Sequence, residues 1–446
     1  MLRGVSVCSE LHSDMVRLLD ERRVELTAAL NERTAGGRTD ALSSVVRSCL
    51  RESGVCVMDG ELSYWGGRSY VPVSRDSVLL VLSNVLADMG ASASDVRRMG
   101  DMPLSCAWDR MVDSDPMLVS FDDCVYDVRS GRRLAHDRQL PVVWRMGYAL
   151  GSDPKCPRWD AFLAEVLPDA SVRACLQEFF GMCFIDRSRL SIEKMAVLIG
   201  SGANGKSVVL ETVTAALGRE RVGRLSPDQL ADPKQAVSLG GKAANFAPDV
   251  RRGAAFDSAL KALASAQDVQ GWQLYHGGVT FRCPPLAFAL NEMPVFRDLT
   301  DAFFRRLLVF RFGVTIDAGR QDRGLLSKMI QTELPGVFMW MMEGRDRLMA
   351  SGGRFSDSPV MDAEIENLKM ERRTMFSDPV AEWMRSNGWS AVPLFGGQSP
   401  SRVRATDVLS GIGDGVTASS VTKSMARMGV ECGRSAGTFY YLYKDS

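Results

Sequence analysis

The sequence predicts an α/β fold in which a parallel-sheet domain lies between an N-terminal α+β domain and a smaller C-terminal domain. Three observations support this. The apolar run 195–199 leads into a glycine-rich loop and then a helix-favouring run, which is the order of a phosphate-binding unit. Two further apolar runs, 243–247 and 286–290, have the length of buried parallel strands. Outside this region, helical periodicity alternates with hairpin signals.

Length and composition predict a globular chain of about three domains. With 446 residues and 46% hydrophobic content, the chain can bury a large core. Lys plus Arg equals Asp plus Glu at 54 each, so any contact with DNA must be local. No apolar stretch reaches the roughly 20 residues of a membrane span, and residues 1–25 lack a signal-peptide core. We therefore expect a cytoplasmic protein without a membrane partner.

The cysteines and histidines do not form a metal-binding pattern. Ten cysteines occur without a CxxC pair, and only three histidines are present, His12, His136 and His276. We expect buried, reduced thiols rather than a zinc site or a disulfide framework.

The N-terminal 150 residues predict short helices and hairpins. Apolar residues recur at three- and four-residue intervals in several segments, with a break predicted at Gly36-Gly37. The predicted helices are 13–30, 41–51, 77–89 and 94–99, and the predicted hairpins lie in 55–73 and 118–134. The acid pair of Asp113 and Asp115 is predicted to lie in a loop, because a two-metal priming site needs further carboxylates and usually a histidine.

The glycine-rich loop after the first apolar run has the GxxxxGKS pattern of a P-loop. Its glycines allow successive backbone N–H groups to face a phosphate, and the following helix adds the positive end of its dipole. Lys206 is expected to bridge the β- and γ-phosphates of ATP, and Ser207 to bind Mg²⁺. The predicted nucleotide-binding residues are Gly200, Ser201, Gly202, Ala203, Asn204, Gly205, Lys206 and Ser207.

An NTPase also needs polar groups at the ends of neighbouring strands. Asp249 follows the apolar run 243–247 and is predicted to bind Mg²⁺ or orient water. Asn291 follows the run 286–290, where its amide is expected to sense the γ-phosphate and position the attacking water.

Two arginines, Arg305 and Arg306, stand between apolar runs near residue 305. A guanidinium that reaches the γ-phosphate of a neighbouring copy would stabilise the transition state. The alternative is an ordinary ion-paired arginine, and the sequence leaves both readings open for each residue.

These motifs, in this order, resemble the superfamily 3 helicases of the phage, plasmid and poxvirus primase-helicase type, over about residues 114–348. The resemblance is carried by FLAEVLPD (162–169), LQEFFG (176–181), GANGKS, GKAAN (241–245), Leu260-Lys261, Phe281, Asn291 with Pro294, Arg305-Arg306 and ELPG (333–336). It implies an AAA+ type P-loop ATPase that assembles as a ring, usually a hexamer, with ATP between subunits and single-stranded or forked DNA in the centre. It further implies that Lys206 and Ser207 form Walker A, Asp249 is the Walker B acid, Asn291 the sensor, and Arg305 or Arg306 the finger.

The sequence departs from this family pattern at two places. The acid is the shorter Asp249 where the family usually has glutamate. The hairpin 269–281, expected to contact DNA, offers only His276 and the adjoining Arg282 as cations, and each missing cation removes a phosphate contact.

The C-terminal region resembles a winged-helix domain. Helices are predicted over 406–410 and 418–428, followed by a hairpin that turns at Ser435-Ala436-Gly437. Lys423, Arg427 and Arg434 could meet DNA phosphates from the second helix and the hairpin. The alternatives are a solvated charged face or a protein-docking surface.

We therefore expect four parts. These are an N-terminal domain preceding the helicase (1–150), an ATPase domain (151–350), a helical linker (351–377) and a winged-helix-like domain (378–446). The expected function is that of an ATP-dependent, ring-forming DNA helicase used in the replication of a phage or mobile element in a bacterial host. Priming is expected to come from a separate primase or initiator. The alternative is a non-translocating, ATP-dependent DNA-binding initiator or assembly factor. A P-loop small-molecule kinase is weaker, since it leaves the C-terminal region unexplained.

Overall fold

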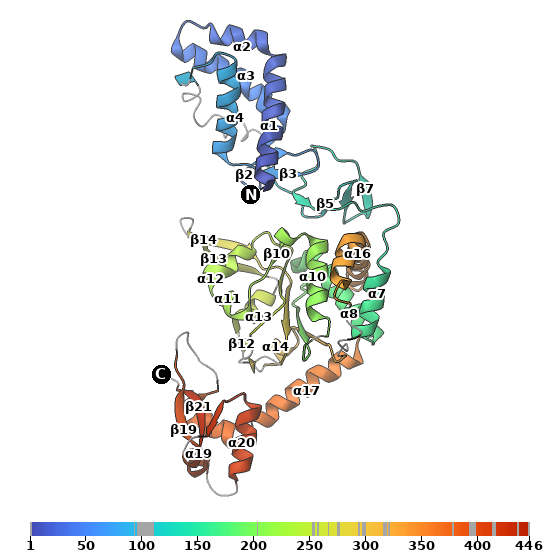
Figure 1. Ribbon diagram of the computed structural model, residues 1–446, viewed down its shortest axis with the longest axis vertical. Coiled ribbons are helices and arrows are strands. Elements are labelled where there is room, and N and C mark those ends of the chain that lie inside the picture. The colour runs from blue at the N-terminus through green and yellow to red at the C-terminus, as the bar shows by residue number, and fades with distance from the viewer. Residues whose placement is uncertain are drawn as a thin grey trace. The chain divides into compact units, whose positions relative to one another are not determined.

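The protein is a mixed α/β chain that divides into two compact units, one of residues 1–155 with 334–336 and one of 156–333 with 337–446. The computed structural model (Figure 1) describes residues 2–92, 94–95, 111–202, 204–251, 255–256, 258–265, 267–273, 277–292, 295–296, 300–314, 319, 322–376, 379–391, 398–412, 416–434 and 437–444. The boundary between the units lies within the Pro/Gly-rich segment 151–157.

A helical bundle forms the first part of the N-terminal unit. Its helices are α1 (Leu2–Glu21), α2 (Arg23–Leu30), α3 (Ala35–Ser53) and α4 (Arg75–Asp88). Their apolar stripes share one buried core. The break predicted at Gly36-Gly37 is wrong, because these glycines lie in the first turn of α3, where the Thr34 side chain accepts a hydrogen bond from the Gly37 N–H at 3.1 Å. The predicted helix 13–30 is instead interrupted at Arg22.

Two four-stranded sheets complete this unit. The first has the order β3-β2-β1-β4 and the second the order β7-β6-β5-β8. Their strands are β1 (Val55–Met58), β2 (Glu61–Trp65), β3 (Tyr70–Pro72), β4 (Met111–Val112), β5 (Leu118–Ser120), β6 (Val125–Asp127), β7 (Arg132–Leu134) and β8 (Trp144–Arg145). The turn predicted at Ser130-Gly131 joins β6 to β7, and the predicted helix 94–99 lies mostly outside the described residues.

A five-stranded parallel sheet forms the centre of the second unit. Its order is β10-β11-β15-β9-β17, and every adjacent pair is parallel. The strands are β9 (Met195–Ile199), β10 (Val222–Gly223), β11 (Ala244–Ala247), β15 (Leu286–Leu290) and β17 (Leu307–Arg311). β9, β11 and β15 are buried along their whole length, as expected for strands covered on both faces.

Short helices and two strand pairs surround this sheet (Figure 1). The helices are α7 (Pro157–Val166), α8 (Ala170–Gly181), η1 (Met182–Phe184), α9 (Arg187–Leu190), α10 (Lys206–Leu217), η2 (Arg219–Arg221), α11 (Pro227–Leu230), α12 (Pro233–Ala236), η3 (Val237–Leu239), α13 (Ser258–Ala264), α14 (Asp301–Phe304), α15 (Leu325–Thr332) and α16 (Leu334–Ala350). β12 (Ala255–Phe256) pairs with β16 (Val295–Phe296), and β13 (Asp268–Gln273) pairs with β14 (Gly277–Arg282).

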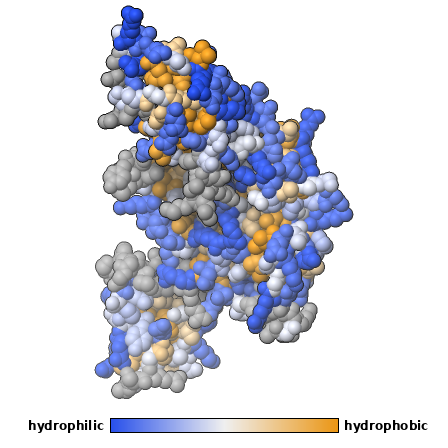
Figure 2. Space-filling view, turned by 45° about the horizontal axis from the view of Figure 1, so that its top comes forward, coloured by the Kyte–Doolittle hydropathy of each residue, from blue (hydrophilic) through white to orange (hydrophobic). Residues whose placement is uncertain are grey.

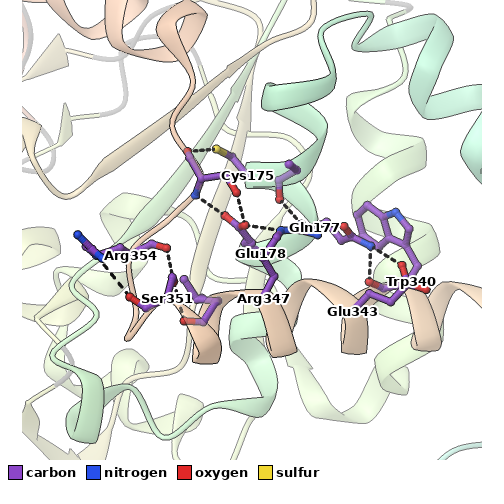
Figure 3. A network of polar contacts seen from close by, with 11 residues as sticks. Cys175, Gln177, Glu178, Trp340, Glu343, Arg347, Ser351 and Arg354 are labelled. Atoms are coloured by element: carbon purple, nitrogen blue, oxygen red, sulfur yellow. Dashed lines mark hydrogen bonds and ion pairs between the residues drawn. The ribbon is translucent and has the colours of Figure 1, made fainter.

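Helices α8 and α16 are held together by close backbone approach and by a buried polar network. A Cβ on Gly181 or Gly344 would collide with the backbone of the other helix. Glu178 is 1% exposed and accepts hydrogen bonds from Arg347 Nε at 2.6 Å and from the Ser356 N–H at 2.8 Å (Figure 3). The segment LQEFFG, which carried part of the family resemblance, therefore has a structural role here.

Replacing Glu178 with glutamine is expected to destabilise this unit by about 2 kcal/mol, because it removes the charge of the buried acceptor while Arg347 keeps its bonds to Ala174 and Gln177. The expected fall in Tm is about 5 °C, measured by thermal unfolding. Asp346→Asn is the matched control on the same helix, since that carboxylate is 68% exposed in its pair with Arg345. Equal Tm values for the two variants would contradict the structural role of Glu178.

The last part of the second unit has the order helix, helix, strand, strand, helix, helix, hairpin. Its elements are α17 (Pro359–Phe376), α18 (Pro379–Ser386), β18 (Trp389–Ser390), β19 (Ser401–Arg404), α19 (Ala405–Ile412), α20 (Ala418–Arg427), β20 (Cys432–Arg434) and β21 (Thr438–Lys444). β21 pairs with all three other strands of its sheet. One face of this sheet and the helices α18 to α20 bury a separate apolar core.

The surface drawn in Figure 2 is mainly hydrophilic, with hydrophobic residues gathered over the N-terminal helices at the top of the view. In the part of the chain that the structure describes, no helix has the length and apolarity needed to cross a bilayer. Eight cysteines of the described part are free thiols, and six of these eight are buried. Burial raises the pKa of Cys156, Cys175 and Cys283 to about 12.

Candidate nucleotide-binding site

The P-loop lies between β9 and α10, at the carboxyl edge of the parallel sheet. Gly202 and Gly205 have φ angles of +104° and +90°, which side chains rarely adopt. A Cβ at Gly200 would collide with the Asn204 side chain and the Phe312 carbonyl. The three glycines of the loop, two of them in the GxxxxGKS pattern, are therefore required by the path of the backbone. Ala203 lies outside the described residues.

Lys206 points back into this loop. Its Nζ donates to the Gly200 carbonyl at 2.6 Å, to Asn204 Oδ1 at 2.9 Å and to Asn291 Oδ1 at 3.4 Å. Lys206 is 5% exposed, and burial lowers the pKa of its ammonium group. Asn204 is also buried and donates to the Phe312 carbonyl at 3.1 Å, which fixes the oxygen that holds the lysine. The loop and the strand end at residue 291 thus meet at one ammonium group.

The start of α10 fits a polyphosphate. The N-cap residue of this 12-residue helix is Gly205, which has no side chain to cap the first-turn N–H groups. These N–H groups and Lys206 are donors at the positive end of the helix dipole, and the exposed Ser207 lies in the same turn. The residues present therefore fit the triphosphate and metal of Mg-ATP.

Asp249 lies at the same edge of the sheet as the loop. It follows β11 and Pro248, and the neighbouring Val250 N–H donates to the Ala289 carbonyl of β15 at 3.1 Å. β15 in turn pairs with β9. Asp249 is exposed, so a ligand at this edge can reach its carboxylate.

Arg305 and Arg306 lie at the opposite edge of the sheet. They precede β17, whose first residue, Leu307, pairs in parallel register with Met195, the first residue of β9. A five-residue strand is about 16 Å long, so one strand length separates these arginines from the P-loop. Neither arginine can reach the phosphate site of its own copy.

The two arginines differ in their exposure. The Arg306 side chain is 9% exposed, and its Nη2 lies 2.7 Å from Glu193 Oε2. The Arg305 side chain is 65% exposed, and its Nη2 lies 3.3 Å from the same oxygen. Arg306 is thus buried in an ion pair within its own chain, whereas the Arg305 side chain is exposed to solvent.

Glu193 is the residue of this region that sequence reasoning missed. It precedes β9, more than 100 residues before the arginines, and only the pairing of β9 with β17 brings them together. An isolated glutamate in the segment before the P-loop strand carries no local signal for this contact.

The predicted cations of the hairpin and the predicted acid of the N-terminal unit are held in ion pairs where the structure describes them. Arg282 is engaged by Asp186 at 3.0 Å and Asp268 at 3.3 Å at the base of the β13–β14 hairpin, and His276 lies outside the described residues. Asp115 forms two 2.7 Å hydrogen bonds with Arg129, and the arginine lowers the pKa of that carboxyl group. Among the described residues, no cluster of three or more metal-ligating side chains occurs.

Comparison with known proteins gives matches to both units. Residues 106–168 match the family described as "D5 N terminal like". A protein of Acanthamoeba polyphaga mimivirus named "Putative helicase L207/L206" is 26% identical over 216 residues, which are 46% of this chain and 22% of that protein. The chain thus corresponds to about a fifth of its viral relative.

Solved structures of the NrS-1 C-terminal region also align with this chain. An A-form apo structure is 12% identical, with a TM-score of 0.48, and the alignment covers 90% of this chain and 98% of that one. Another apo structure, of residues 305–718, is 10% identical with a TM-score of 0.44. The family segment and the viral relative both support a likeness to D5-type primase-helicases, the group that the motifs of this chain resemble.

Proposed function

We propose that this chain is an ATP-driven DNA helicase that works as a closed ring, usually of six copies, in the replication of a phage or other mobile element. The observation that carries the proposal is the division of the catalytic groups between two edges of one sheet. Lys206 and Asn291 meet at the P-loop, and the exposed Arg305 lies a strand length away. A complete site therefore needs a second copy, as in an AAA+ type assembly.

Each residue at the P-loop edge has a distinct task in this proposal. The Lys206 ammonium group would exchange the Gly200 carbonyl for the β- and γ-phosphate oxygens of ATP. Ser207 and Asp249 would hold Mg²⁺, directly or through its water shell. Asn291, already beside Lys206, would orient the attacking water. Bound Mg-ATP supplies the phosphoanhydride and the charge of the metal.

Arg305 would complete the site of the adjoining copy. Its pair with Glu193 is exposed and worth at most about 1 kcal/mol, so a γ-phosphate can displace the carboxylate at little cost. A guanidinium placed there stabilises the charge that spreads over the phosphoryl oxygens. Hydrolysis would remove this contact and thereby loosen the interface between copies.

The remaining regions would supply nucleic-acid contacts and partners. The order of elements from α18 to β21 supports a winged-helix-like domain. Asp115 is engaged by Arg129, so we propose that priming comes from a separate primase or initiator.

A second candidate, a non-translocating initiator or assembly factor, is favoured by one observation. Arg282, the cation in the described part of the β13–β14 hairpin, is already paired with two aspartates. A hairpin whose arginine is already ion-paired would bind DNA phosphates less strongly. ATP would then serve only to close the ring.

Turnover and unwinding distinguish the two candidates. The helicase proposal predicts that single-stranded DNA raises the ATPase rate several-fold, that ATP promotes a ring visible by light scattering, and that a forked duplex is separated. ATP-dependent rings without DNA stimulation or strand separation would favour the assembly factor. A monomer under all conditions would contradict both.

A further inference from the structure

Among the described residues, the helices α18 to α20 pack on one face of the C-terminal sheet and not on the other. Alternate residues of β21 point to opposite faces of a sheet, and Tyr440 and Leu442 are fully buried against α19 and α20. Phe439, Tyr441 and Tyr443 therefore line the other face. All three are half-buried and lie outside the apolar core.

Cations flank this aromatic row. Arg402 and Arg404 of β19 pair directly with Tyr441 and Phe439, so they lie on the same face, and both are exposed. The four strands of the sheet contain no aspartate or glutamate. The open face therefore combines aromatic rings with arginine side chains.

Contacts within this face hold the rings in place. The Arg402 guanidinium lies over the Phe439 ring, 4.2 Å from its centroid. On the other side of β21, Gly433 pairs with Phe439, and a Cβ there would come within 3.0 Å of the Tyr441 hydroxyl. Tyr441 thus extends over a position that has no side chain.

We propose that this face, defined as Arg402, Arg404, Phe439, Tyr441 and Tyr443, binds single-stranded nucleic acid. Bases stack on aromatic rings and on guanidinium planes, and arginines contact the phosphates between them. A duplex keeps its bases stacked inside, so the aromatic row would not engage it. The surface lies apart from the P-loop in sequence and rests on the proposed helicase function only for its use during unwinding.

The same domain has a rival basic surface on α20. Lys423 and Arg427 lie one helical turn apart on the exposed side of this helix, whereas Val421 and Met425 face the sheet. α20 packs on the covered side of the sheet, since Thr422 Oγ1 and the Tyr440 hydroxyl are 2.9 Å apart. The two surfaces are therefore on opposite sides of the domain, which provides a matched control.

The test measures binding of fluorescein-labelled oligo-dT, oligo-U and a blunt duplex to the full chain without nucleotide, by anisotropy. Tyr441→Ala is expected to weaken oligo-dT binding about tenfold, while Tyr441→Phe retains it because the ring remains. Arg402→Ala with Arg404→Ala should weaken binding and reduce the salt slope by about 1.4, for two phosphate contacts on a single strand. Lys423→Ala with Arg427→Ala should leave oligo-dT binding unchanged.

Wild-type oligo-dT affinity in the sheet-face variants, or a loss confined to the α20 variant, would overturn the proposal. An equal loss on the blunt duplex would also overturn it. If the sheet-face variants lose affinity for oligo-U as well as for oligo-dT, the proposal is supported and the face does not distinguish RNA from DNA. If they lose affinity for oligo-dT alone, the proposal is supported and the face prefers DNA. DNA-free ATP turnover, expected to be unchanged in the sheet-face variants, separates this outcome from a failure of the P-loop assignment.

Discussion

Lys206→Ala is expected to lower ATP turnover by at least about a hundredfold, the loss that follows removal of one preorganised donor to a transition-state oxyanion. Its ammonium group is the point at which the P-loop, Asn204 and Asn291 converge. Removal would also leave the Gly200 carbonyl and the Asn204 side chain without their shared donor. Steady-state phosphate release measures the effect, and binding of a fluorescent ATP analogue separates lost affinity from lost chemistry.

The matched control for this variant is Lys234→Ala, since Lys234 is an exposed lysine on α12. It should retain wild-type turnover and nucleotide affinity. If Lys206→Ala hydrolysed ATP at the wild-type rate, the P-loop would not be the catalytic site.

Arg305→Ala is expected to reduce turnover roughly a thousandfold, because an arginine finger contributes about 10³ or more to phosphoryl transfer. The variant should fold normally, since the exposed pair with Glu193 contributes little to stability. ATP binding should persist, because the phosphate donors of the P-loop remain. The decisive pattern is therefore normal Tm and near-normal nucleotide affinity with lost turnover, measured on one preparation.

Arg306→Ala provides the contrast to Arg305→Ala. This arginine is buried against Glu193, so its removal should act mainly through stability, by about 3 kcal/mol. If Arg306→Ala kept its Tm and lost turnover while Arg305→Ala remained active, the roles assigned to the two arginines would be reversed.

Much of the central sheet is predictable from local pattern. The apolar runs 195–199 and 286–290 are β9 and β15 with the predicted bounds. Their burial on both faces makes them continuous apolar segments, which are readable without any partner strand. The P-loop is equally local, because its glycines are required by the backbone itself.

Features that depend on distant pairing could not be predicted. Glu193 meets Arg305 only because β17 pairs with β9. Glu333 was recognised only within a family motif. In the structure its buried carboxylate accepts hydrogen bonds from the Arg158 and Trp159 N–H groups and so caps α7. The Gly36-Gly37 pair was misread because the cap supplied by Thr34 offsets the cost of glycine in a first turn.

The site shared between copies is tested most directly by mixing two inactive variants. Lys206→Ala copies retain Arg305, and Arg305→Ala copies retain Lys206, so a mixed ring contains interfaces in which both groups are intact. An equal mixture should recover about a quarter of wild-type turnover if copies assemble at random and interfaces act independently. Lys206→Ala copies mixed with the Lys206→Ala/Arg305→Ala double variant should stay inactive. A mixture of the two single variants that remained as inactive as either one alone, although both assemble into rings, would contradict a site completed by the neighbouring copy.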